Sequence, residues 1–297
     1  MANIGVLGAG SWGTALSVLL HDNGNQATIW SIDPAEIEML SKEREHKTKL
    51  PGVHISEEIQ ITGEIQEAIL GKDFLVLAVP SPFTRATAKK MSSYVAEGQI
   101  IVDVAKGIEE TTLMTLSGQI KEEIPQADVA VLSGPSHAEE VGRKLPTTCV
   151  IGATTRKTAE YLQSAFMSKV FRVYTSPDIL GIELGGSLKN VIALAAGIAD
   201  GLGYGDNTKA ALITRGIAEI ARLGVNFIFS AKARCVIPSS SIRFDMIAAI
   251  ACEWQIQSSL LFSIIFIPSP KALSILSSAI VCIKNTFALF CRQRYYK

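Results

Sequence analysis

The sequence has no excess of either charge, because 28 Lys and Arg side chains balance 28 Asp and Glu side chains over 297 residues. Composition therefore gives no reason to expect a nucleic acid or an anionic lipid surface as a partner. The five cysteines show no metal-type spacing, so we expect no bound metal and a reducing compartment. No basic leader precedes the first apolar run, I-G-V-L-G, and we expect a cytoplasmic protein.

Glycine is missing from the last quarter of the chain. All 23 glycines lie at or before Gly224. Residues 226–297 hold four of the five cysteines, seven of the eleven phenylalanines, and eight Lys and Arg against two Asp and Glu. Residues 1–225 carry 20 Lys and Arg against 26 Asp and Glu, so the composition changes near Val225.

Short apolar runs alternate with helical patterns in the first part of the chain. The runs predict strands at 3–8, 27–30, 74–79, 99–104, 129–132, 148–151 and 170–174. Strands that alternate with helices indicate an α/β protein, with a mostly parallel sheet covered by helices on both faces. From about Pro177 the pattern is helical, so we expect a first domain at 1–177 and a helical second domain at 178–297.

The stretch Gly8-Ala9-Gly10-Ser11-Trp12-Gly13 matches G-x-G-x-x-G between the first strand and the first helix. In this pattern the first glycine permits a tight turn, and the second lets the backbone approach a pyrophosphate. The third glycine allows the helix to pack closely on the sheet. The helix N-terminus then faces the anion, so Gly8, Gly10 and Gly13 predict a dinucleotide site. A glycine-rich turn without a ligand is the alternative.

The end of the second strand bears on cofactor choice. Asp33 is placed either to hold the ribose 2′-hydroxyl or to cap the helix that starts at Pro34. No Lys or Arg occupies positions 31–33 to bind a 2′-phosphate, so this stretch favours NAD over NADP.

Two later strand ends carry candidate polar groups. Lys106 follows strand 99–104, at the sheet edge where α/β proteins bind ligands, although a solvated lysine is common there. Ser136 and Glu139 predict a capping box, and the amides near Gly134 remain available to a ligand. We see no partner residue for His137 and assign it no acid or base role.

Lys189 lies on a helical stripe built mostly of small residues. Its neighbours three and four positions away are Gly185, Gly186, Ile192 and Ala193, with Asn190 beside it. Such a stripe gives a lysine no packing role but leaves room for a ligand to approach its ammonium. Buried lysines readily act as general acids or bases, so Lys189 is the candidate catalytic residue.

Five segments together resemble the bacterial type of the NAD(P)-dependent glycerol-3-phosphate dehydrogenase family. They are G-A-G-S-W-G-T-A-L, V-A-K-G-I-E, S-G-P-S-H-A-E-E, L-G-G-S-L-K-N-V-I-A-L-A-A-G and A-A-L-I-T-R-G-I-A-E-I-A-R-L-G, in the family's order from residue 3 to about Val225. The resemblance implies a Rossmann domain, a doubly wound parallel sheet, followed by an all-helical domain that is truncated or aberrant from about residue 226. It also implies hydride transfer between NAD(P)H and dihydroxyacetone phosphate, which gives sn-glycerol 3-phosphate for glycerophospholipid synthesis.

The same resemblance implies roles for individual residues. Lys189 matches the proton donor or acceptor at the substrate oxygen. The substrate site, for dihydroxyacetone phosphate or sn-glycerol 3-phosphate, is expected to include Lys106, Gly134, Ser136, Lys189 and Asn190. The cofactor, NAD or NADP, is expected to contact the glycine loop with Ser11, Trp12, Lys106 and Ala138. For assembly, a homodimer is one alternative.

Two departures from the family pattern stand out. Ile32 replaces a basic residue that many members carry, which puts NADP preference in doubt. After Gly224 the family continues with a glycine-rich segment and a Ser/Arg/Asn cluster, but this chain runs into N-F-I-F-S-A-K-A-R-C-V-I-P. Out-of-frame translation or a wrongly joined gene model would produce such a break. We expect a chain of this kind to bind the cofactor but to reduce the substrate feebly or not at all.

Two other interpretations remain open from the sequence. The chain is alternatively an NAD(P)-binding protein without catalysis. The apolar stretches 258–268 and 272–291 suggest a membrane anchor, but the first is too short to span and the second contains Lys284, so we expect no membrane span.

Overall fold

A computed structural model describes the backbone of residues 1–232 and the side chains of residues 1–225. The chain divides into two compact units, Met1–Glu183 and Leu184–Lys297, with the division inside helix α7 (Ile179–Gly201). The predicted aberrant sequence from about 226 lies beyond the described side chains. The apolar stretches at 258–268 and 272–291 lie outside the described residues altogether.

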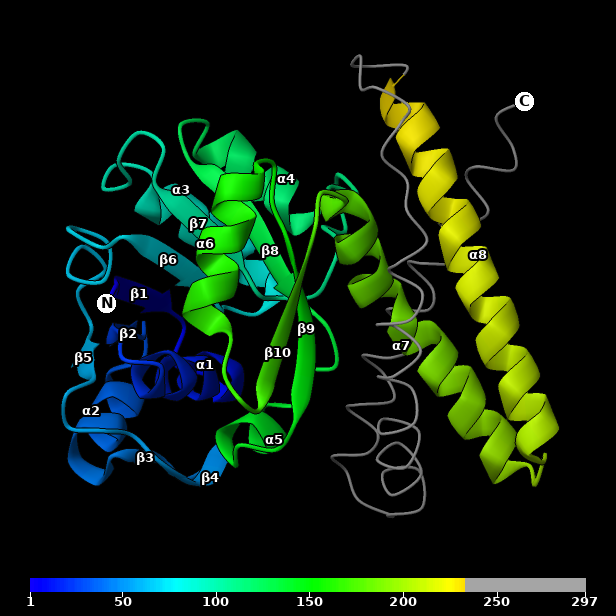
Figure 1. Ribbon diagram of the computed structural model, residues 1–297, viewed down its shortest axis with the longest axis horizontal. Coiled ribbons are helices and arrows are strands. Elements are labelled where there is room, and N and C mark those ends of the chain that lie inside the picture. The colour runs from blue at the N-terminus through cyan, green and yellow to red at the C-terminus, as the bar shows by residue number, and fades with distance from the viewer. Residues whose placement is uncertain (233–297) are drawn as a thin grey trace. The chain divides into compact units, whose positions relative to one another are not determined.

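The first unit is built on an eight-stranded sheet with the order β10-β9-β8-β7-β6-β1-β2-β5 (Figure 1). Neighbouring strands are parallel except β8 and β9, which are antiparallel, so the prediction of a mostly parallel sheet is confirmed. The strands are β1 (Asn3–Leu7), β2 (Gln26–Trp30), β5 (Gln60–Thr62), β6 (Phe74–Leu77), β7 (Ile100–Asp103), β8 (Asp128–Ser133), β9 (Thr147–Gly152) and β10 (Phe171–Ser176).

All seven predicted strands are present, and the sequence missed three short ones. These are β5 at the sheet edge and the separate pair β3 (Glu45–His46) and β4 (Leu50–His54). They lack the continuous apolar run of the central strands, because none of them is buried along its whole length. An edge strand or an isolated ribbon needs less apolar sequence, and therefore gives a weaker signal.

Helices cover both faces of this sheet, and β6 shows how the residues divide between them. Phe74 and Val76 pack in a core with side chains of α1 (Ser11–Asp22) and α6 (Arg156–Phe166). Leu75 and Leu77 face the other way, into a core with α3 (Thr84–Met91) and α4 (Leu116–Glu123). Because side chains alternate between the faces and both faces are covered, every residue of β6 is apolar.

The order of the strands reverses between β1 and β6. From β1 the chain builds outward through β2 to β5, and then returns to build β6, β7 and β8 on the other side. In open α/β sheets, ligands bind outside the carboxyl ends of the strands at such a switch point. The glycine loop that follows β1, and the turns that follow β6, β7 and β8, therefore meet at the functional edge of the sheet.

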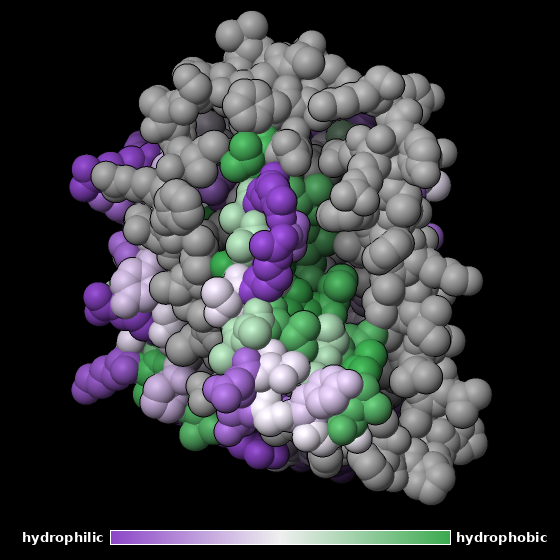
Figure 2. All heavy atoms as spheres, turned by 90° about the vertical axis from the view of Figure 1, so that its right-hand side faces the viewer, coloured by the Kyte–Doolittle hydropathy of each residue, from purple (hydrophilic) through white to green (hydrophobic). Residues whose placement is uncertain are grey.

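The second unit contains most of α7 and the helix α8 (Asp206–Lys232). A Cβ added at Gly216 of α8 would lie 2.4 Å from Cδ1 of Ile192, so the absence of a side chain lets the two helices pack closely. An ion pair of 2.9 Å joins Lys209 of α8 to Asp200 near the end of α7. Figure 2, which faces α8, shows a row of hydrophilic side chains beside a hydrophobic strip.

Among the described helices, only α7 has the length and hydropathy of a membrane-spanning helix. Of its most apolar window, 61% is buried inside the structure, which is the behaviour of a core helix. The apolar composition of α7 is therefore accounted for by packing and does not indicate a membrane span.

Candidate functional site

The three glycines of the loop after β1 have different steric roles. Gly8 has a φ of 118°, and a Cβ there would lie 2.8 Å from the carbonyl of Ala78. A Cβ on Gly13 would lie 1.9 Å from the oxygen of Gly8, whereas a Cβ on Gly10 would meet nothing within 4 Å. The turn and the close packing expected of the first and third glycines are confirmed, and the space beside Gly10 is open to a ligand.

The start of α1 offers hydrogen-bond donors to that space. Gly10 is the N-cap and supplies no side chain, and the amide of Thr14 is the one that bonds back to its carbonyl. The amides of Ser11, Trp12 and Gly13 therefore have no acceptor within the helix. In the part of the chain that the structure describes, the indole Nε1 of Trp12 is buried without a hydrogen-bond partner. The three amides, at the positive end of the helix dipole, suit a pyrophosphate.

At the end of β2, Asp33 takes the role of a helix cap. Its Oδ1 accepts a hydrogen bond of 3.0 Å from the amide of Ala35, in the first turn of α2 (Pro34–Glu43). From the sequence, Asp33 could either cap this helix or bind the ribose, and the structure shows the cap. Ile32 next to it is exposed, at 68%.

Glu36 is a second carboxylate at this end of β2, and the sequence analysis missed it. Its Oε1 accepts hydrogen bonds from Nζ of Lys49 at 2.6 Å and lies 2.9 Å from Nε2 of the buried His46, and its Oε2 accepts from Ser31. Burial favours a higher pKa for Glu36, but the hydrogen bonds from Lys49, Ser31 and His46 outweigh it and lower the pKa. The spacing Asp33-x-x-Glu36 resembles a capping box, and this pattern could have pointed to Glu36 from the sequence.

Lys106 and Ser136 are brought together by two neighbouring strands. Lys106 follows β7, Ser136 follows β8, and Nζ of Lys106 donates a hydrogen bond of 2.7 Å to Oγ of Ser136. The capping box predicted for Ser136 is wrong. Helix α5 (Ala138–Gly142) begins two residues later, with His137 as its N-cap and no side-chain cap bond. The Ser136 hydroxyl instead accepts from a charged donor, and such bonds are stronger than a bond to a neutral amide.

Gly134 fixes the start of the Ser136 turn. Its φ is 151°, and a Cβ there would lie 2.7 Å from the oxygen of Thr148 on β9. The turn therefore lies directly against β9. Ala138, two residues beyond Ser136, is buried in the core cluster against which Trp12 packs. Trp12 and Ala138, both predicted to contact the cofactor, therefore pack against the same core.

His137 has a partner that the sequence analysis did not find. Its Nδ1 lies 3.0 Å from Oε2 of Glu139, and both side chains are more than a third exposed. A histidine and a carboxylate this exposed form a weak surface pair, so the geometry adds no acid or base role for His137.

Asp103 is a buried carboxyl group three residues before Lys106, and the charge of a second carboxyl group, Glu183, acts on it. Asp103 ends β7 at 2% exposure, and its Oδ1 accepts a hydrogen bond of 3.3 Å from the amide of Ala105. Burial, and then the charge of Glu183, hold the pKa of Asp103 well above its usual range. The sequence does indicate this buried carboxyl group, because Asp103 is the single acid within the apolar run I-I-V-D-V.

Glu183 of α7 caps the start of α4. It accepts hydrogen bonds from the amide of Ser117, at 2.8 Å, and from the hydroxyl of Ser117. Burial raises the pKa of Glu183 above its ordinary value in spite of these bonds. No pattern in the sequence indicated this contact, because the two residues are 66 positions apart.

In the second unit, Lys189 is buried, with 3% exposure. Its Nζ donates a hydrogen bond of 3.2 Å to Oδ1 of Asn190, which is itself exposed. Ile192, the one large residue of this stripe, packs against Gly216 of α8.

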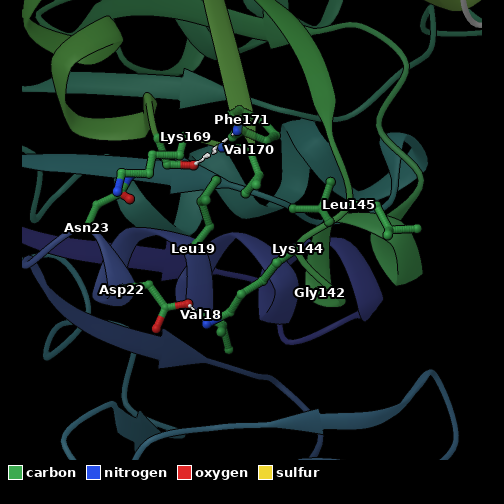
Figure 3. Close-up of a pocket in the computed structure, with 12 residues that line it drawn as sticks. Val18, Leu19, Asp22, Asn23, Gly142, Lys144, Leu145, Lys169, Val170 and Phe171 are labelled. Carbon is green, nitrogen blue, oxygen red and sulfur yellow. Dashed lines mark hydrogen bonds and ion pairs between the residues drawn. The ribbon is translucent and has the colours of Figure 1, made fainter.

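A cavity of about 230 Å³ at the other end of α1 is separate from these residues (Figure 3). Lys144 and Asp22 form an ion pair of 3.0 Å beside it, and none of the predicted site residues lines it. Because α1 begins at the glycine loop and ends at this cavity, the cavity is not part of the nucleotide loop. Among the described residues, no group of His, Cys, Asp and Glu has the arrangement of a metal site.

Family models match most of the chain. The model for the N-terminus of NAD-dependent glycerol-3-phosphate dehydrogenase matches residues 3–159, and the model for the C-terminus of the same enzymes matches residues 178–250. The chain belongs to this family. The second match continues past residue 225, where the motif resemblance ends, and reaches residues beyond those that the structure describes.

Sequence relatives with this family name are closely similar. The NAD(P)+ glycerol-3-phosphate dehydrogenase of Agathobacter rectalis is 63% identical over 253 residues, which cover 85% of this chain and 74% of the relative. The enzyme of the same name from Fusobacterium nucleatum is 58% identical over 227 residues, 76% of this chain and 68% of the relative.

A solved structure supports the same family. The crystal structure of glycerol-3-phosphate dehydrogenase from Coxiella burnetii is 26% identical to this glycerol-3-phosphate dehydrogenase family member, with a TM-score of 0.80. The similarity covers 99% of this chain and 90% of that chain.

Proposed function

We infer that this protein interconverts dihydroxyacetone phosphate and sn-glycerol 3-phosphate by hydride transfer with NAD(P)H, a reaction that feeds glycerophospholipid synthesis. The observation that carries this inference is the 63% identity to a glycerol-3-phosphate dehydrogenase over 85% of the chain. The site geometry is in keeping with it, because a nucleotide loop, a lysine paired with a serine, and a buried lysine are all present.

The first unit supplies the residues that hold the cofactor. The amides of Ser11, Trp12 and Gly13 are proposed to bind the pyrophosphate beside Gly10, where a Cβ would meet nothing within 4 Å. Lys106 and Ala138 are proposed to contact the cofactor as well. The bound nicotinamide supplies the hydride. Positions 31–33 carry no Lys or Arg, and Glu36 holds the ammonium of Lys49 at 2.6 Å, which supports NAD as the better cofactor.

The lysines act on the substrate in different ways. Lys106 and Ser136 are proposed to bind and orient the substrate, with Gly134 and Asn190 as further contacts. Hydride attack on the carbonyl carbon places negative charge on the carbonyl oxygen. Lys189 is proposed to stabilise that charge with its ammonium and to donate a proton to the oxygen, and to accept the proton in the reverse direction.

An assay with a matched variant tests this function. Purified protein is mixed with dihydroxyacetone phosphate and NADH or NADPH, and cofactor oxidation is followed; cofactor binding is measured separately by NADH fluorescence. Because the sequence departs from the family pattern after Gly224, we expect NADH binding with only feeble turnover in the wild type. Lys189→Met should lower kcat further, by about 10²-fold or more, with NADH binding retained. Binding without turnover in the wild type would favour the non-catalytic alternative.

Two further properties are proposed from the family assignment. We propose that the protein works in the cytoplasm on a small, diffusible substrate, and that a homodimer is the assembly to look for. Light scattering after size-exclusion chromatography measures the mass directly, and a monomer of 31.9 kDa would contradict the dimer.

A further inference from the structure

The loop between β7 and α4, residues 104–115, carries Lys106 and is held by one arginine of α3. Nε of Arg85 donates to Oε1 of Glu109 at 2.6 Å, and Nη2 of Arg85 donates to Oε2 at 2.8 Å. This is a bidentate pair, which fixes the direction of a carboxylate as well as its distance. Glu109 lies three residues after Lys106.

Glu109 is also the residue around which the loop turns. Its amide donates to the oxygen of Met114 at 2.9 Å, and its carbonyl accepts from the amide of Leu113 at 2.9 Å. The hydroxyl of Thr112 donates to the same carboxylate that Arg85 holds. A single side chain therefore joins Arg85 to both arms of the loop.

A second contact fixes the backbone directly after Lys106. A Cβ on Gly107 would lie 2.6 Å from Cβ of Ser81, at the start of the segment that leads into α3. The segment after β6 thus meets the Lys106 loop at Gly107 and again at Glu109. With both positions set, little freedom remains for the backbone of Lys106.

Arg85 also holds two acids of α4. Its Nη1 donates to Glu122 at 2.6 Å and to Glu123 at 2.9 Å. Both acids lie in the last turn of α4, where the helix dipole disfavours negative charge. Without Arg85, three carboxylates would face one another with no cation between them, and the loop would be pushed away from α4.

We propose that Arg85 is a positioning residue for the reaction, which holds the 104–115 loop through Glu109 so that the Lys106 ammonium reaches Ser136. This role rests on the proposed function. Arg85 is not a catalytic residue, because it acts on the substrate only through the placement of Lys106.

The first test compares Arg85→Met with Arg156→Met. Arg156 also pairs with a glutamate, at 2.7 Å from Glu160, but it lies on α6 at the surface and serves as the matched control. We expect amide hydrogen exchange in 104–115 to speed up about tenfold in Arg85→Met, with no change in residues 5–16. Arg156→Met should leave both segments unchanged.

The second test uses activity and chemical rescue. A misplaced Lys106 should lower kcat/KM for dihydroxyacetone phosphate by about 100-fold in Arg85→Ala. Added guanidinium chloride, at concentrations far below those that unfold proteins, should restore part of it by occupying the space beside Glu109. Guanidinium would further impair a variant that was merely unstable, and it should not rescue Lys106→Ala.

The outcomes separate this proposal from the proposed function. Absence of dihydroxyacetone phosphate reduction by the wild type, even at high enzyme concentration, would count against the proposed function, whereas the exchange of 104–115 would still report on Arg85. Unchanged exchange in Arg85→Met, or unchanged kcat/KM in Arg85→Ala, would overturn the positioning role. Should Arg85→Met fail to fold, Glu109→Gln removes the same pair with little change in shape, and it must loosen the same loop.

Discussion

Nζ of Lys106 and Oγ of Ser136 are joined by a hydrogen bond of 2.7 Å between the ends of two neighbouring strands. Ser136→Ala removes the acceptor and leaves the ammonium to sample other positions. A hydrogen bond to a charged group is worth about 1.5–3 kcal/mol, so kcat/KM for dihydroxyacetone phosphate should fall about 10- to 100-fold. Steady-state kinetics measure this loss, and full activity in Ser136→Ala would remove Ser136 from the site.

The glycine loop gives a prediction in which two similar substitutions separate folding from binding. Gly13→Ala forces a Cβ to within 1.9 Å of the Gly8 oxygen, so the midpoint of thermal unfolding should fall by several degrees. Gly10→Ala meets nothing in the protein and should leave that midpoint unchanged, yet weaken NADH binding where the cofactor approaches the backbone. Calorimetry and NADH titration of both variants check this. Unimpaired NADH binding by Gly10→Ala would show that the open space is not the pyrophosphate site.

The end of β2 predicts how cofactor preference can be changed. Ile32 is 68% exposed, and an arginine in its place would add a cation without disturbing the core. We expect Ile32→Arg to raise the ratio of kcat/KM for NADPH to that for NADH by about tenfold, because a guanidinium pairs well with a 2′-phosphate. The wild type should prefer NADH. A wild type that prefers NADPH would contradict the role given to this strand end.

Asp103 predicts how stability depends on pH. Its pKa in the folded state is raised by burial and by Glu183, so the fold favours the protonated form. The contribution of Asp103 to stability is therefore fully present below its unfolded pKa of about 4, and is lost as the pH rises through the folded-state value. Asp103→Asn keeps an oxygen that can accept from the Ala105 amide but carries no charge.

We thus expect Asp103→Asn to be more stable than the wild type at pH 8, with the advantage disappearing towards pH 4. Urea unfolding at several pH values measures the difference in the free energy of unfolding. Asp22→Asn, a change of an exposed acid at the end of α1, is the control. A destabilised Asp103→Asn at pH 8 would show that the ionised carboxylate is needed in the fold.

The sequence predicted those features that depend on neighbouring residues. Apolar runs gave the central strands, because burial on both faces requires residues such as Phe74 and Leu75 in succession. The requirement for glycine at positions 8 and 13 could also be predicted, because it arises within one short loop of the G-x-G-x-x-G pattern. Lys189 stood out because a lysine among small apolar neighbours has no packing role, and in the structure its side chain is buried.

Long-range contacts account for what the sequence did not predict. The capping box at Ser136 failed because its hydroxyl is occupied by Lys106, 30 residues away. Arg85 meets Glu109 across 24 residues, and Glu183 meets Ser117 across 66. No spacing rule links such pairs, since they depend on which strands, helices and loops the fold brings side by side.

The contact between Gly13 and the oxygen of Gly8 also has a consequence for how this loop can change over time. A larger residue at either position collides with backbone, and backbone cannot be trimmed by a second mutation as a side chain can. A lineage that loses one of these glycines cannot regain the space by shortening a neighbouring side chain. We therefore expect less room for change at Gly8 and Gly13 than at Gly10, whose surroundings are open.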